Sequence, residues 1–134
     1  MIKRNANPRK QGDAGLGVAI CWFAGNGYTV CVPLTDSQRY DLVVENGSGL
    51  FRVSVKTSTQ KSTSGRYMVG LRTIGSNMYR TTIKKFDASE YEYLFAACED
   101  GTRYLIPATA IESGNTITLS GRYEKYKIAD VAER

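Results

Sequence analysis

The chain has 134 residues, the size of one compact domain, and this length excludes two full domains. Hydrophobic residues make up 42% and charged residues 23%, so the sequence can form a packed core and lacks the composition of a disordered chain. It contains no histidine, which excludes mechanisms that need an imidazole base or an imidazole metal ligand. The net charge of +5 favours a polyanionic partner, although a solvated basic surface would give the same value.

The first 27 residues predict a basic arm followed by one helix. Residues 1–12 are polar and basic and contain Pro8, so they are expected to form a flexible arm. In residues 13–25 the apolar side chains recur at steps of three and four, which is the period of a helix. Gly25-Asn26-Gly27 follows, and these residue types commonly end a helix.

The cysteines bear on the cellular compartment. Cys21, Cys31 and Cys98 have no C-x-x-C spacing, and three cysteines cannot all pair within one chain, so we expect reduced thiols and a cytoplasmic protein. The apolar run 15–24 follows basic residues as in a signal peptide, but its glycines and the missing cleavage site argue against one. Because the run is also too short for a membrane span, we expect no membrane partner.

After the helix the hydrophobic period changes to that of strands. Gly47-Ser48-Gly49 suits the turn of a hairpin, and residues 74–90 lack a sustained pattern, which indicates a functional loop. Strands are expected at residues 28–34, 41–46, 50–57, 66–73, 93–98, 103–107 and 116–119, with a helical turn at 108–112. The fold class is therefore mixed α/β: an N-terminal helix, then a mostly antiparallel meander, in a single domain over residues 13–121 with a basic tail at 122–134.

The hairpin expected around residues 47–49 brings three polar side chains together. Ser54 and Lys56 share one face of their strand, and Asp41 begins the antiparallel partner, so all three can converge. A carboxylate that binds Mg²⁺ beside a lysine suits metal-assisted phosphodiester hydrolysis. An ordinary cross-strand ion pair would have the same spacing, and the spacing alone leaves both interpretations open.

A wider set of short motifs resembles a known family. In chain order they are residues 11–13 (QGD), 27–28 (GY), 30–34 (VCVPL), 40–44 (YDLVV), 52–57 (RVSVKT), 91–95 (YEYLF) and 104–107 (YLIP). This order resembles the PD-(D/E)XK nuclease superfamily, and more narrowly the small homing endonucleases associated with group I introns. The resemblance implies a restriction-endonuclease-like core, Mg²⁺-dependent cleavage of double-stranded DNA by a homo-oligomer, and a bacterial or phage-infected host cell.

The resemblance also assigns residue roles, and two of the family's four active-site positions are replaced. Asp41 matches the metal-binding aspartate and Lys56 the catalytic lysine, whereas Leu16 stands in place of a helix glutamate and Ser54 in place of Glu, Asp or Gln. Some restriction enzymes with Ser-x-Lys recover the carboxylate about a dozen residues later, but no acid lies between Lys56 and Asp87.

Two other acids offer weak substitutes for the missing carboxylate. Asp13 could bind the metal from the first turn of the expected helix, but a helix cap is an equally good interpretation of this residue. Glu45 lies roughly 13 Å from Asp41 along the strand, which is too far to chelate the same ion.

Basic residues form three clusters that could neutralise phosphates without reading sequence. Tyrosines interleave with two of them and could stack on bases. The clusters are the arm (Lys3, Arg4, Arg9 and Lys10), the loop (Arg80, Lys84 and Lys85) and the tail (Arg122, Lys125 and Lys127).

These observations lead to three hypotheses about function. The first is a nucleic-acid-binding homologue of a homing endonuclease with weak or lost cleavage, because Leu16 and Ser54 remove oxygen ligands. The second is an active Mg²⁺-dependent endonuclease that uses Asp41 and Lys56. The third is a repurposed module that binds RNA or protein. Whether the chain is an enzyme therefore stays open, with Mg²⁺ as its cofactor if it is active and none otherwise.

Overall fold

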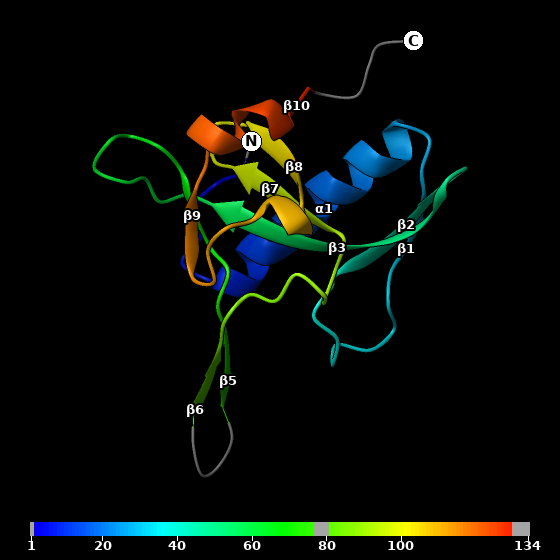
Figure 1. Cartoon of the computed structure of the whole chain (residues 1–134), viewed down its shortest axis with the longest axis horizontal. Helices are drawn as coiled ribbons and strands as arrows, with labels where there is room; N and C mark the ends of the chain where they lie inside the picture. The colour runs from blue at the N-terminus through cyan, green and yellow to red at the C-terminus, as the bar shows by residue number, and fades with distance from the viewer. Residues whose placement is uncertain (1, 77–80, 130–134) are drawn as a thin grey trace.

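The computed structural model describes residues 2–76 and 81–129, and the side chains of residues 2–72 and 85–129. A single long helix, α1 (Pro8–Gly25), crosses one face of a twisted sheet, and smaller strands and 3₁₀ turns cover the other face (Figure 1). Among the described residues, no helix is long and apolar enough to cross a membrane.

Helix α1 begins five residues earlier than the sequence pattern indicated. The Asn7 side chain accepts a hydrogen bond from the Arg9 amide at 3.0 Å, and Pro8 occupies the first helical turn. Asparagine at the N-cap and proline just inside it are signals for a helix start as well as for a loop. Residues 8–12, expected within the arm, are therefore helical, and Ile2 is buried in the core.

The main sheet contains six strands within the described part of the chain. Their order is β1 (Thr29–Cys31), β2 (Leu42–Asn46), β3 (Gly49–Ser58), β7 (Tyr93–Cys98), β8 (Arg103–Pro107) and β10 (Lys127–Ile128). Neighbours are antiparallel except β3 and β7, which run parallel with Val53 opposite Tyr93. The predicted mixed α/β fold with a mostly antiparallel sheet is confirmed.

The segment between β3 and β7 does not continue the meander. Strand β4 (Met68–Gly70) leaves the main sheet and pairs with β9 (Thr116–Thr118). The expected loop 74–90 contains much of a hairpin, β5 (Thr73–Ser76) with β6 (Thr81–Lys84), which projects from the body in Figure 1. Two 3₁₀ turns, η1 (Ala108–Ala110) and η2 (Gly121–Tyr126), complete the described elements, and η2 with β10 forms most of the expected tail.

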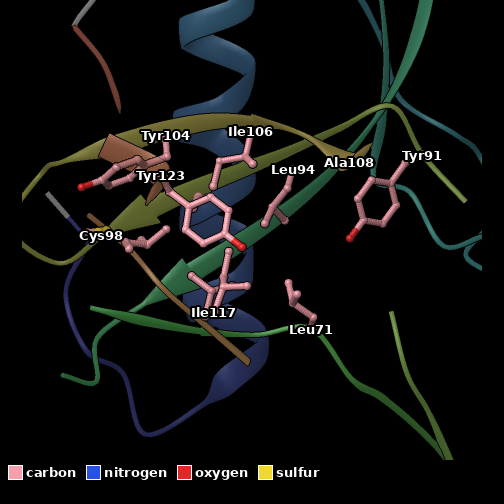
Figure 2. Close-up of a cluster of buried hydrophobic side chains, with 12 residues drawn as sticks. Leu71, Tyr91, Leu94, Cys98, Tyr104, Ile106, Ala108, Ile117 and Tyr123 are labelled. Carbon is pink, nitrogen blue, oxygen red and sulfur yellow. The ribbon is translucent and has the colours of Figure 1, made fainter. Parts of the chain in front are cut away.

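Alternation along β3 divides the interior into two clusters of buried side chains. Val53 packs with Phe23, Leu42 and Phe95 under α1, and the half-buried Val55 joins them. On the opposite face Leu94, Ile106, Ile117 and Tyr123 form the second cluster, with Tyr91 at its edge (Figure 2). Because Ser54 and Lys56 alternate with Val53 and Val55, they lie on the face away from α1.

Two helix glycines should respond oppositely to alanine. A Cβ at Gly15 would lie 2.3 Å from the Thr57 Cγ2, whereas a Cβ at Gly17 meets no atom within 4 Å. We expect Gly17→Ala to stabilise the fold by about 0.5–1 kcal/mol through helix propensity. Gly15→Ala should lower the free energy of unfolding by about 1–2 kcal/mol, because overpacking against β3 outweighs that gain. Urea unfolding of both variants measures the contrast, and equal stabilisation would mean that α1 sits farther from β3.

Candidate active site

Asp41 is fixed where β2 separates from β3. Its amide donates to the Val53 carbonyl at 2.8 Å, and the Val55 amide donates to its Oδ2 at 2.7 Å. Because Leu42 pairs with Val53, Asp41 stands opposite Ser54, and its carboxylate interacts electrostatically with Lys56. The structure thus brings together the three side chains that the sequence placed around the hairpin.

The carboxyl group of Asp41 reaches the surface but loses part of its water shell to the surrounding strands. This desolvation raises the pKa of Asp41 above its ordinary value, although the Val55 amide and the Lys56 ammonium partly oppose the shift. A carboxyl with a raised pKa holds its charge at a cost to the folded state. Such a cost is common where a charge serves function rather than stability.

Asp41→Asn should therefore stabilise the fold modestly near neutral pH. With a raised folded pKa, the folded state binds more protons than the unfolded state between the two pKa values, so stability falls as pH rises through that interval. Asn cannot ionise and can still accept from the Val55 amide, so the gain should vanish below about pH 3, where both states are protonated. Urea midpoints at both pH values measure it, with the exposed loop variant Asp36→Asn as the control. Destabilisation by Asp41→Asn near neutral pH would contradict the argument.

A small pocket of about 20 Å³ adjoins Ser54 and Lys56. Ser54 is 2% exposed, and its hydroxyl is hydrogen-bonded to that of Tyr91, which is 5% exposed. Burial raises the pKa of Tyr91 to about 12, so the phenol stays neutral and hydrogen-bonded at neutral pH. Its ring packs on Phe86 with centroids 5.5 Å apart, and Leu71 also lines the pocket. Figure 2 shows Leu71 and Tyr91 in the buried cluster on this face of the sheet. The Tyr91 side chain therefore occupies space next to the candidate catalytic residues.

Three further residues line this pocket, and no sequence pattern connects them with Asp41: Glu90, Arg39 and Lys85. Arg39 Nε lies 3.7 Å from Glu90 Oε2. Glu90 comes near because β7 runs parallel to β3, and a fork of hydrogen bonds between Arg52 and Glu92 holds this register, with Nη2 to Oε2 at 2.6 Å. Hydrogen bonding from Arg52 lowers the pKa of Glu92, which keeps the pair ionised.

The replaced helix position lies on the other side of β3. Leu16 is half-buried and packs against the cluster under α1, while the neighbouring turn is tied to β3 by a 3.0 Å hydrogen bond from Gln11 Nε2 to Thr57 Oγ1. In the described register, β2 pairs with β3 only up to Val53. The part of β3 that follows Val53 is therefore not covered by β2, and β3 contacts α1. The alternative acids Asp13 and Glu45 are exposed, and Glu45 pairs with Leu50 at the far end of β2.

The donor atoms around Asp41 do not fit a Mg²⁺ ion. Within residues 2–76 and 81–129, no group of three His, Cys, Asp or Glu side chains could hold a metal. One Asp41 oxygen accepts the Val55 amide, the Ser54 hydroxyl is bound to Tyr91, and Glu90 faces Arg39. Mg²⁺ requires several well-placed oxygens, and this arrangement supplies one available carboxylate.

The predicted basic clusters differ in whether their side chains are exposed and whether they already contact other residues. All four arm residues are exposed near the start of α1, and Lys85 is exposed beside the pocket. Arg80 lies outside the described residues, as does the side chain of Lys84. In the tail cluster, Arg122 pairs with Glu112, Lys127 lies 3.9 Å from Glu124, and the Lys125 ammonium lies 5.3 Å from the Tyr126 ring centroid.

Comparison with known proteins gives a family match and matches to solved structures, one of which is described below. A family model described as PD-(D/E)XK endonuclease matches residues 6–129. The solved structure of a bacterial homing endonuclease, I-Ssp6803I, superposes with a TM-score of 0.78 at 26% sequence identity, covering 92% of this chain and 89% of that one. No curated protein sequence matches the chain significantly.

Proposed function

Because the chain belongs to the PD-(D/E)XK endonuclease family, we propose that it binds double-stranded DNA as a nuclease homologue whose own cleavage activity is weak or lost. The observation that carries the proposal is the Asp41, Ser54 and Lys56 constellation. It retains the family's aspartate and lysine, while Ser54 is bound to Tyr91 and the half-buried Leu16 packs against the cluster under α1. These contacts favour a scaffold kept for binding over a working metal site.

The charge around the pocket supports DNA as the ligand. Lys56 and the exposed Lys85 line the same pocket. Phosphate oxygens are natural partners for such lysines, and the exposed arm residues can add contacts that do not depend on sequence.

A homo-oligomer is the assembly that fits this function, since one site meets one strand of a duplex. The large apolar side chains Val32, Leu34 and Leu50 are 55%, 103% and 67% exposed, and they supply surface that a second copy could cover. The free thiols Cys21, Cys31 and Cys98 are in keeping with the cytoplasm of a bacterial or phage-infected cell as the setting.

The test combines binding with cleavage on the full chain. Fluorescence anisotropy should detect binding to duplex DNA of unrelated sequences, and supercoiled plasmid incubated with Mg²⁺ should stay intact. Mg²⁺-dependent nicking that Asp41→Asn abolishes would overturn the silent-homologue proposal in favour of the active enzyme. Stronger binding to single-stranded RNA than to duplex DNA, with intact plasmid, would instead assign the chain to a repurposed RNA-binding module.

A further inference from the structure

A second and larger hollow lies away from the candidate active site. It has a volume of about 290 Å³ and shares no lining residue with the pocket beside Ser54 and Lys56. Its walls come from the turn that ends at Arg66, from β9 and from the start of η2. Neither the nuclease resemblance nor the constellation around Asp41 accounts for it.

Two guanidinium groups face this hollow. Arg66 is exposed and forms no ion pair with any residue in the described part of the chain, whereas Arg122 pairs with Glu112 on the same wall. The three charged lining residues therefore leave one net positive charge. An arginine donates two parallel N–H groups to the oxygens of a phosphate, which a surface lysine cannot do.

Hydroxyl groups complete the polar lining. In β9, Ile117 is buried, so Thr116 and Thr118 share the opposite face, and both line the hollow. Ser120 also lines the hollow. A hollow lined by hydroxyl donors and two arginines suits a tetrahedral oxyanion better than an apolar ligand, which would leave these groups without partners.

The backbone at this point is strained. Ser120 has φ 77° and ψ −171°, a region that side chains other than glycine rarely enter, and Gly121 follows at φ 60°. A Cβ at Gly121 would lie 3.4 Å from Nη1 of Arg66, so the turn passes close to that guanidinium without covering it. Strain of this kind costs free energy and concentrates at ligand sites.

We propose that this hollow is a phosphate-binding site, in which Arg66 and Arg122 grip the phosphate oxygens and the hydroxyls of β9 and Ser120 donate to the remaining ones. The ligand is a phosphate group, carried either by a nucleic-acid backbone or by a small free phosphate. The pair between Arg122 and Glu112 opposes binding, because the carboxylate competes with the phosphate for the same guanidinium.

NMR titration of the full chain tests the site. Inorganic phosphate should shift the backbone amides of residues 116–122, and Arg66→Gln with Arg122→Gln should weaken this binding about tenfold or more. Glu112→Gln should strengthen it several-fold, because it frees Arg122. The control is Lys61→Gln, which removes an exposed cation from the loop that contains Arg66. The Lys61 ammonium lies 4.9 Å from the Tyr67 ring centroid, and its loss should change the affinity for phosphate by less than about twofold.

A second titration, with short duplex DNA, distinguishes a nucleic-acid phosphate from a free phosphate as the ligand. If the nucleic-acid backbone is the ligand, duplex shifts the same amides, and the double arginine variant loses those shifts. If duplex leaves these amides unmoved while inorganic phosphate shifts them, the ligand is a free phosphate. The proposal fails if neither ligand moves residues 116–122, or if the double variant responds as the original chain does. That failure leaves the DNA-binding proposal standing, since anisotropy measures duplex binding through Lys85 and the arm independently.

Discussion

Duplex DNA should bind this chain on the order of 100- to 1,000-fold more weakly at about 200 mM salt than at about 50 mM, as expected for roughly four to six phosphate contacts. The exposed arm residues Lys3, Arg4, Arg9 and Lys10, together with Lys85, supply enough cations for that number. Each contact releases condensed counterions, so the logarithm of the affinity should fall linearly with the logarithm of salt concentration. Anisotropy at several salt concentrations gives the slope directly.

Removing Lys84 and Lys85 together should flatten this slope by about 1 to 2 and weaken binding to unrelated sequences alike. The matched control is Lys127→Ala, because Lys127 already lies 3.9 Å from Glu124 and has less free charge to offer a phosphate. Its effect should be smaller. An affinity that hardly changes with salt, or a loss confined to one DNA sequence, would show that backbone phosphates do not drive binding.

The sequence predicted those parts of the fold that depend on local patterns. The turn Gly47-Ser48-Gly49 and the alternation on either side of it predicted that Asp41 comes close to Ser54 and Lys56, and the pairing of Leu42 with Val53 agrees with this. The start of α1 was misplaced because asparagine and proline serve both loops and helix N-termini. The same two residue types occur in loops and at helix starts, and the hydrophobic period distinguishes a helix from a loop only after the first helical turn.

The remaining parts of the site depend on a contact between distant segments. Tyr91 and Glu90 reach the pocket because β7 pairs parallel to β3, and such a pairing leaves no trace in the period of either strand. The EYEYL segment at residues 90–94 has the alternation of any half-buried strand. The Arg52 to Glu92 fork that holds the register is likewise invisible before the fold is known.

The side chains that fill the pocket decide how the family's four active-site groups could be restored. Leu16→Glu with Ser54→Gln restores the family's four groups, but Ser54 is 2% exposed beside a pocket of about 20 Å³, and Tyr91 fills the space that a glutamine would need. The double variant should therefore be overpacked, at a cost of about 1–3 kcal/mol, and should remain inert. Tyr91→Val removes roughly the volume that glutamine adds.

The triple variant Leu16→Glu, Ser54→Gln and Tyr91→Val should nick supercoiled plasmid when Mg²⁺ is added, whereas we expect the original chain to leave it intact. A new carboxylate at the half-buried position 16 is costly without a cation, so the triple variant should unfold more easily in EDTA than the chain it derives from. Metal at about 100 times its Kd should return roughly 2.7 kcal/mol. Asp41→Asn in this background should abolish both the nicking and the metal-dependent stabilisation, because it removes the charge that makes the ion bind.

Thermal unfolding with and without Mg²⁺ therefore separates a site that forms from a site that fails to fold. A triple variant that gains stability from Mg²⁺ but leaves plasmid intact would show that restoring the two replaced ligands is not enough for cleavage. In that case the half-buried position of Leu16, on the far side of β3 from Lys56, becomes the explanation. A glutamate there would bind the ion without aligning it on the phosphate, and catalysis depends on that alignment to within about 1 Å.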